Sequence, residues 1–347
     1  MIAVFGETPY QILSGINIAY SEFHDECVLF VMRDMFKTDI KFELQLEDYS
    51  GFIKGIYYTE RYPSFLESED KNNFRASSPS YDYRFVFDRI ITHKYGNAAM
   101  SLYDSYVDNK PKLYHFEEGI GEYLVLDELT NRELLRDVER KYLSIPDLYP
   151  GNAVVSIAKS PPISSDSCFL NELNRLFRYR GELNKYKKYI YFGQTLSIDY
   201  NNRVFADIEK KCFKLYKKCR LKKQLTIKAH PRNKASYHLG FKNLHTMAPW
   251  ECVVAELPDI ENRVLVSTSS TCLVTPKLLF NKEPYIICTA KLFENELRNV
   301  VIKDDYYERL IAFFENVRNI YIRKEKFFIP NNLDELEIAI NSSNEKA

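Results

Sequence analysis

The chain has 347 residues, more than one ordinary hydrophobic core accommodates, so its length predicts two domains. Its apolar and charged fractions, 45% and 28%, are those of a globular protein. The longest apolar runs fall well short of the roughly 20 residues of a membrane-spanning helix, and the N-terminus lacks the pattern of a secretion signal. Seven cysteines without metal-ligand spacing argue against a disulfide framework or a zinc site, so we expect a cytoplasmic location.

Charge is distributed unevenly although the net charge is zero. Residues 1–150 contain 16 Lys and Arg against 26 Asp and Glu, whereas residues 151–347 contain 32 against 22. The positive C-terminal half is suited to an anionic ligand such as a phosphate or a membrane lipid. The alternative is that the excess charge lies on solvated helix faces. A nucleic-acid partner is not expected, because the sequence has no recognition motif for one.

Short β-branched and aromatic runs alternate with helix-length segments along the chain. The first series is IAVF (2–5), CVLFVM (27–32), FIKGIYY (52–58) and KLYHF (112–116). The second is YIYFG (189–193), LTIKAH (225–230), RVLVSTSS (263–270) and PYIICT (284–289). Because parallel neighbours need a crossover helix, this alternation predicts an α/β fold with parallel sheets. A proline-containing segment at 145–188 is predicted to link the halves, and 341–347 is predicted to be a frayed tail.

The strongest cluster of positive charge is KKCFKLYKKCRLKKQ at 210–224. Helical spacing brings Phe213, Tyr216 and then Cys219 or Arg220 to one face, with lysines over the rest. This pattern is typical of an amphipathic helix that contacts a membrane surface. A helix that covers one side of the second sheet and keeps its lysines in water has the same pattern and is the more common case.

An acidic pair, Glu117 and Glu118, directly follows the predicted strand KLYHF and precedes glycines that let the backbone turn. Ligands of α/β sheets bind at the carboxyl ends of the strands, so at least one carboxylate is expected to face such a ligand. A carboxylate in that place can take the proton of an attacking hydroxyl. The alternative is an ordinary turn.

Two further groups follow strands of the second series. In KAHPR, Lys228 and His230 are expected on one strand face, with Pro231 ending the strand, and both can bind a phosphate leaving group. The hydroxyl run 267–271 is expected to precede a helix, where hydroxyls and free N–H groups bind anions. Simple helix capping is the alternative. The sequence has no D-x-D triplet, the metal-binding pattern of many sugar transferases, and no P-loop or G-x-G-x-x-G.

The order E-E-G, K-A-H-P and serine cluster resembles the three short motifs of bacterial sialyltransferases. The opening G-E-T-P-Y-Q-I-L further resembles glycosyltransferase family 52, which includes lipooligosaccharide and capsule sialyltransferases. The resemblance implies a GT-B fold, in which two Rossmann-like domains with parallel sheets face a central cleft. It also implies CMP-sialic acid as donor, inversion at the anomeric carbon, and neither a metal nor a cofactor.

Site residues carried over from the resemblance fall in both halves. Glu117 matches the general base, with Glu118 as the alternative, although many relatives have Asp there. His230 matches the histidine that contacts the departing phosphate, and Lys228 lies where the nucleotide is held. Ser269 and Ser270 match phosphate-binding serines, with Ser267 and Thr268 as the alternative pair. Glu251 resembles the acid that holds the cytidine ribose, and Glu256 is its rival.

The sequence therefore predicts a sialyltransferase that transfers sialic acid to a terminal sugar, galactose by expectation, of a capsule or lipooligosaccharide. The predicted domains are 1–160 on the acceptor side, with the base, 185–330 for the nucleotide sugar, and 331–347 as a C-terminal helix and tail. The acceptor is expected to be lipid-linked, with peripheral contact at the inner face of the plasma membrane through 210–224. The alternatives are a hexosyltransferase of the same family and a non-catalytic scaffold of glycan assembly.

Overall fold

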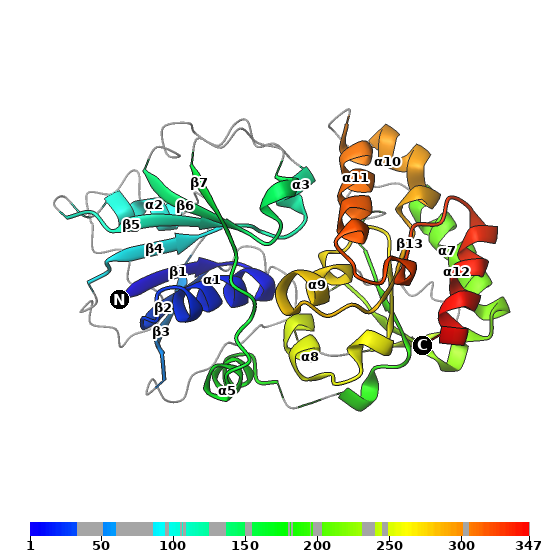
Figure 1. Cartoon of the computed structure of the whole chain (residues 1–347), viewed down its shortest axis with the longest axis horizontal. Coiled ribbons are helices and arrows are strands. Elements are labelled where there is room, and N and C mark those ends of the chain that lie inside the picture. The colour runs from blue at the N-terminus through cyan, green and yellow to red at the C-terminus, as the bar shows by residue number, and fades with distance from the viewer. Residues whose placement is uncertain are drawn as a thin grey trace. The chain divides into compact units, whose positions relative to one another are not determined.

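The computed structural model describes residues 1–32, 51–59, 86–93, 97–104, 106, 109–124, 137–149, 155–179, 181, 183–194, 196, 203–230, 240–244, 249–300 and 305–346. The chain divides into two compact units (Figure 1). The first unit consists of Met1–Glu122 and Leu126–Arg180, and the second of Tyr123–Val125 and Gly181–Ala347. Each unit contains one parallel sheet with helices packed on it.

The first unit is built on a seven-stranded sheet, counted over the described residues, in the order β3-β2-β1-β4-β5-β6-β7. All of its neighbouring strands pair in parallel. The strands are β1 (Ile2–Gly6), β2 (Cys27–Met32), β3 (Ile53–Thr59), β4 (Arg89–Thr92), β5 (Lys112–Phe116), β6 (Val138–Leu143) and β7 (Ser156–Lys159). The helices are α1 (Pro9–Ser21), α2 (Asn97–Asp104), α3 (Gly121–Leu124) and α5 (Ser167–Leu176).

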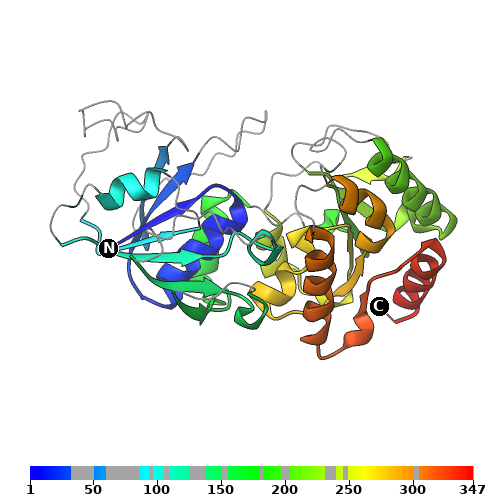
Figure 2. The same cartoon turned by 90° about the horizontal axis from the view of Figure 1, so that it is seen from above.

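Helices α1 and α2 cover opposite faces of this sheet (Figure 2). A capping box between Thr8 and Gln11, with a proline at the first helical position, starts α1 directly after β1. The helix packs so closely that a Cβ on Gly15 would lie 2.5 Å from Val4 Cγ1. On the other face, Phe5 is buried in a cluster with residues of α2. The alternation of side chains along β1 therefore supplies two apolar layers.

The second unit is built on a six-stranded parallel sheet in the order β10-β9-β8-β11-β12-β13, again counted over the part of the chain that is described. Its strands are β8 (Tyr189–Phe192), β9 (Leu225–Lys228), β10 (Lys242–Asn243), β11 (Val264–Ser267), β12 (Tyr285–Cys288) and β13 (Phe327–Phe328). The helices are α7 (Arg203–Lys218), α8 (Trp250–Glu256), α9 (Thr275–Phe280), α10 (Glu294–Val300), α11 (Tyr306–Asn319) and α12 (Leu333–Lys346).

The core of the second unit lies on both faces of its sheet. Phe213 and Tyr216 of α7 are buried with Leu336 and Ile340 of α12 against one face. On the other face, the indole of Trp250 in α8 packs edge-on against the ring of Phe192, with 4.8 Å between the ring centroids. The apolar stripe predicted in the basic segment is therefore core.

The predicted α/β class with parallel sheets is confirmed, and each of the eight predicted runs contains a strand. The bounds agree for 27–32 and 112–116, whereas the runs 225–230 and 263–270 end as strands at Lys228 and Ser267. Three strands of the first sheet, β4, β6 and β7, were not predicted. In β6 the sequence VERKYL places three charged residues in a row, which hides the alternation typical of a strand. Lys141 of this strand is buried and forms an ion pair with Glu122, a partner that only the tertiary structure brings close.

Three expectations about segments are corrected. The predicted linker 145–188 does contain the boundary between the two units, after residue 180, but it also contains β7 and α5. Glu172 of α5 accepts hydrogen bonds from the backbone N–H groups of Phe52 and Ile53 at 3.2 and 3.1 Å. The basic helix does not span 210–224, because α7 ends at Lys218 and Arg220 takes a left-handed conformation with φ of 60°. The predicted frayed tail is helical through Lys346.

Candidate functional site

Both sheets have the strand order in which α/β proteins bind ligands. The order reverses between β1 and β4 in the first unit and between β8 and β11 in the second. At such a switch point neighbouring loops leave in opposite directions and open a crevice outside the carboxyl ends of the strands. Most of the predicted site residues end or directly follow β5, β9 or β11 and therefore belong to these carboxyl ends, whereas Glu251 and Glu256 lie on α8.

Glu117 follows β5 directly and is only 2% exposed. Its carboxylate accepts hydrogen bonds from the Tyr10 hydroxyl at 2.6 Å, from the Ser144 backbone N–H at 2.9 Å and from the Ser144 hydroxyl. Tyr10 lies on α1, which follows β1, and Ser144 follows β6. The carboxylate therefore joins the loops that leave three strands and holds the carboxyl edge of the sheet together.

Glu118 differs from its neighbour because it is half-buried. The next residue, Gly119, has φ of 115°, a conformation that favours glycine and turns the chain as the sequence predicted. A base that takes a proton from an incoming hydroxyl needs surface that the hydroxyl can reach. On exposure alone, Glu118 meets this requirement better than Glu117.

Two titratable residues near the acidic pair were not predicted as parts of a site. The Nε2–H of His115 donates to the backbone carbonyl of His93 at 2.8 Å, and burial together with the nearby charge of Lys141 lowers the His115 pKa to about 3. The Lys141 ammonium forms an ion pair with Glu122 and donates to the Tyr149 hydroxyl at 3.0 Å. His115 is therefore uncharged at neutral pH, and no sequence motif distinguished it within its strand.

In the second unit, Lys228 is the last residue of β9, and His230 lies two residues beyond. The prediction that both extend from one strand face is therefore wrong, since the strand ends before His230. Both residues are half-buried, so each has surface available to a ligand. Pro231 and Arg232 lie outside the described residues.

The hydroxyl run after β11 divides into a buried and a partly exposed pair. The Ser267 hydroxyl donates to the Phe192 carbonyl at 2.8 Å, and the hydroxyl oxygens of Thr268 and Thr289 lie 3.2 Å apart; Ser267 and Thr268 are buried. Ser269 and Ser270 are half-buried. Thr271, the last residue of the run, is also half-buried, so Ser269, Ser270 and Thr271 present more surface to a ligand than Ser267 and Thr268 do.

The expected helix does not follow the hydroxyl run directly. Ser270 caps a short 3-10 turn, Thr271–Leu273, by accepting a hydrogen bond from the Cys272 N–H at 3.2 Å. Helix α9 begins only at Thr275. The run therefore does not form an anion site at the N-terminus of an α-helix. Its hydroxyl groups are the donors that it can offer to an anion.

Glu251 lies in the first turn of α8 and is 6% exposed. Burial raises the pKa of its carboxyl group, while its own backbone N–H and the positive charge of Lys228 act in the opposite direction. The charge of Lys228, at the end of β9, therefore acts on the carboxyl group of Glu251. Its rival Glu256, at the end of the same helix, is half-buried, and its Oε2 would lie 3.8 Å from a Cβ placed on Gly181.

Gln194, which follows Gly193 after β8, was not predicted as a site residue. Its side-chain amide lies 3.3 Å from the Ser267 hydroxyl and 3.4 Å from the Ser269 hydroxyl. It therefore spans the ends of β8 and β11, the two strands at the switch point. In α/β sheets the loop after the first strand often contacts the ligand, and this rule could have identified Gln194 from the sequence.

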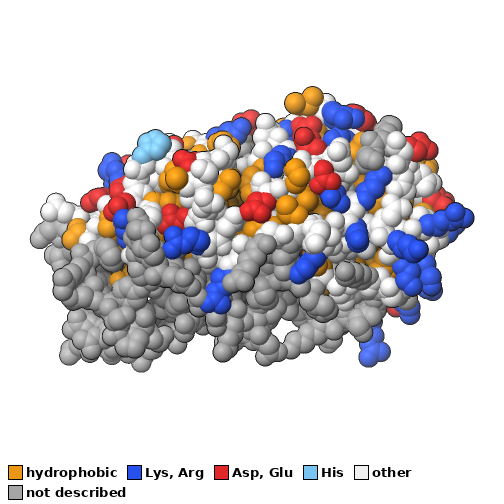
Figure 3. All heavy atoms as spheres, turned by 90° about the horizontal axis from the view of Figure 1, so that it is seen from below, with side chains coloured by type: hydrophobic (Ala, Val, Ile, Leu, Met, Phe, Trp, Pro, Cys, Tyr) orange, Lys and Arg blue, Asp and Glu red, His pale blue; other side chains and the backbone are white. Residues whose placement is uncertain are grey.

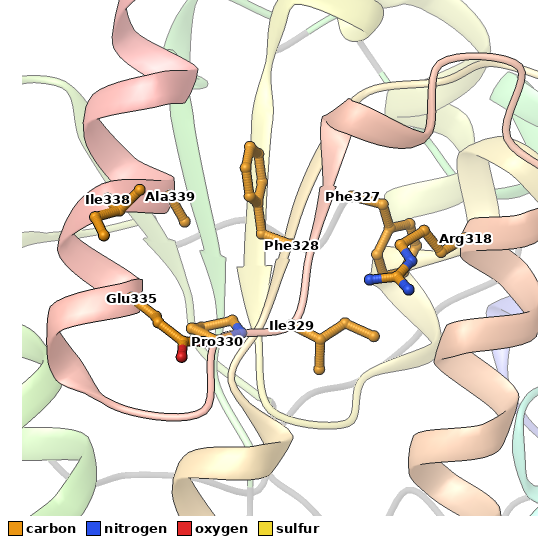
Figure 4. Close-up of a pocket in the computed structure, with 8 residues that line it drawn as sticks. All are labelled: Arg318, Phe327, Phe328, Ile329, Pro330, Glu335, Ile338 and Ala339. Carbon is orange, nitrogen blue, oxygen red and sulfur yellow. The ribbon is translucent and has the colours of Figure 1, made fainter.

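A pocket of the second unit lies away from these residues. It has a volume of about 240 Å³ and is lined by Phe328 and Pro330, by α12 residues that include Ile338, and by Arg318 of α11 (Figure 4). None of the predicted site residues lines it. A smaller cavity, lined in part by Gln194 and Thr268, has about 10 Å³, which accommodates no more than a water molecule.

The comparisons with known proteins add no assignment. No family model matches the sequence, and no curated protein matches it. Among the described residues, no helix is long and apolar enough to span a membrane. In the same part of the chain, no group of three or more His, Cys, Asp or Glu residues is arranged to hold a metal ion.

Proposed function

We propose that the chain is an inverting sialyltransferase that uses CMP-sialic acid without a metal ion. One observation carries this proposal. Lys228, His230, Ser269 and Ser270 are partly exposed and lie at or just beyond the carboxyl ends of β9 and β11, which flank β8 beside the switch point of the second sheet. Cationic, imidazole and hydroxyl donors together are suited to a phosphate. They belong to the half of the sequence with excess positive charge.

The chemistry of sialyl transfer requires such donors. When the bond from the anomeric carbon to the CMP oxygen breaks, positive charge develops on the sugar and negative charge on the phosphate. Fixed donors at the phosphate stabilise the transition state more than the ground state, and this difference accelerates the step. In the proposed roles, His230 and the serines bind the departing phosphate, Lys228 holds the nucleotide, and Glu251 holds its ribose.

The acceptor hydroxyl needs a base on the opposite face of the sugar. We assign this role to the acidic pair of the first unit, with Glu117 as the base proposed from the sequence. The greater exposure of Glu118 supports that residue as the alternative. In the GT-B arrangement proposed here, this pair and the phosphate donors serve one cleft, and the attack inverts the anomeric centre.

A lipid-linked glycan acceptor at the inner face of the plasma membrane remains part of the proposal. The lysines of α7 are exposed, and Lys and Arg side chains gather on the right of the face drawn in Figure 3. Since Phe213 and Tyr216 are buried in the core, this helix has no apolar face to insert into lipid. Membrane contact through α7 is therefore proposed as electrostatic attraction to anionic headgroups.

The test is incubation of the purified chain with CMP-sialic acid and a panel of galactosides, with and without a chelator. We expect release of CMP that depends on a galactoside and is unaffected by the chelator. His230→Ala should reduce the rate by about 100-fold or more while the fold stays intact. Thermal stabilisation by UDP and not by CMP would favour a hexosyltransferase, and an absence of turnover with every donor would leave the scaffold function.

A further inference from the structure

The hydrogen-bond directions around Gln194 follow from the groups involved. The Ser267 hydroxyl donates to the Phe192 carbonyl, so towards Gln194 it acts as an acceptor. The Gln194 amide nitrogen therefore faces Ser267, and the amide oxygen faces Ser269 and accepts from its hydroxyl. A single chain of hydrogen bonds thus runs from Ser269 through Gln194 and Ser267 to the end of β8.

The backbone beside Gln194 is packed tightly against the loop that carries His230. The N–H of Gly193 donates to the Lys228 carbonyl at 3.0 Å. A Cβ on Gly193 would lie 3.2 Å from the backbone nitrogen of His230 and 3.3 Å from the Ala229 Cα, closer than ordinary contacts. Glycine therefore lets the loops after β8 and β9 approach, which brings Gln194 and the His230 backbone to the same part of the crevice.

We infer that Gln194 is a positioning residue, which holds the Ser269 hydroxyl ready to donate to the phosphate of the bound nucleotide. The inference rests on the proposed function and adds a residue to that site. When a phosphate arrives, the Ser269 proton turns from the amide oxygen to a phosphate oxygen. A charged phosphate oxygen is the stronger acceptor, so the exchange favours binding.

The neutrality of the amide is essential to this role. A carboxylate in place of Gln194 has nearly the same shape, but it keeps the Ser269 proton in a charge-assisted hydrogen bond. It also repels the phosphate at short range. Gln194→Glu should therefore weaken binding of a phosphorylated nucleoside and leave the unphosphorylated nucleoside unaffected.

The experiment compares CMP and cytidine binding by calorimetry for wild type, Gln194→Glu and the control Gln224→Glu. Gln224 is exposed in the same unit, so its substitution introduces the same charge away from the site. We expect Gln194→Glu to weaken CMP binding by at least about 10-fold and the control to leave it unchanged, with cytidine binding equal in all three. Equal loss of CMP and cytidine binding would show structural damage and overturn the inference.

A second comparison tests whether Gln194 acts through Ser269. Gln194→Ala should weaken CMP binding in the wild-type background and have no further effect when combined with Ser269→Ala, because the two residues then share one interaction. Additive losses would overturn the positioning role. If the wild type binds CMP and Gln194→Glu binds it with the same affinity, the inference is overturned and the proposed function stands. If the wild type does not bind CMP, both the inference and the proposed function are overturned.

Discussion

Replacing Glu117 by Gln should destabilise the first unit as well as affect chemistry. The carboxylate is buried and accepts hydrogen bonds from the Tyr10 hydroxyl and from the backbone N–H and the hydroxyl of Ser144. An amide has nearly the same shape but replaces one acceptor oxygen by a donor NH₂ group. At least one donor of Tyr10 or Ser144 would then face another donor in the interior.

The magnitude follows from these contacts. A hydrogen bond to a charged group contributes about 1.5–3 kcal/mol, and a buried donor left without an acceptor costs about 1–3 kcal/mol. Because the amide retains part of the network, we expect Glu117→Gln to lower the free energy of unfolding by about 2–3 kcal/mol. For a unit of this size the melting temperature falls by about 2–4 °C per kcal/mol, or roughly 4–12 °C here.

The assay is urea and thermal denaturation followed by circular dichroism. Glu118→Gln is the matched control, because this half-buried neighbour should change stability by less than about 0.5 kcal/mol. Equal stability of the two variants would refute the structural role of Glu117. If Glu117 has this structural role, a loss of activity in Glu117→Gln identifies it as the base only after correction for the unfolded fraction. A loss of activity in Glu118→Gln needs no such correction and would identify Glu118 as the base directly.

Two buried groups should give stability profiles of opposite slope with pH. Burial and Lys141 lower the His115 pKa to about 3 from an ordinary value of 6.5, so stability is lost as pH falls below 6.5, at up to about 1.4 kcal/mol per pH unit. His115→Gln, whose amide can still donate to His93, should flatten the slope between pH 7.5 and 5.5; an unchanged slope would contradict this. Burial raises the Glu251 pKa above 4.5, so stability is lost as pH rises through that range. Glu251→Gln should therefore raise the melting temperature at pH 8, by about 2–4 °C for each kcal/mol that it adds to the free energy of unfolding. The increase should vanish near pH 4.5, and an increase that does not depend on pH would refute the role of the Glu251 charge.

The local pattern of the sequence was sufficient for the fold class and for most of the strands. Runs such as CVLFV (27–31) and YIYF (189–192) are buried on both faces and therefore appear in the sequence as continuous apolar segments. Strand β6 was missed because its charged residues Arg140 and Lys141 form ion pairs with Glu22 and Glu122, which lie far from them in the sequence. The segment carrying β7 was missed because its prolines indicate a linker.

The sequence by itself determined which chemical groups follow the strands: the acidic pair after β5, Lys228 and His230 at β9, and the hydroxyl run after β11. Only the tertiary structure decided which of them are accessible. Glu117 is enclosed by donors from two other loops, Ser267 is bonded to β8, and Gln194 meets the serines because β8 and β11 are neighbours. Adjacency in a parallel sheet arises from pairing between strands far apart in the chain, and no local pattern encodes it.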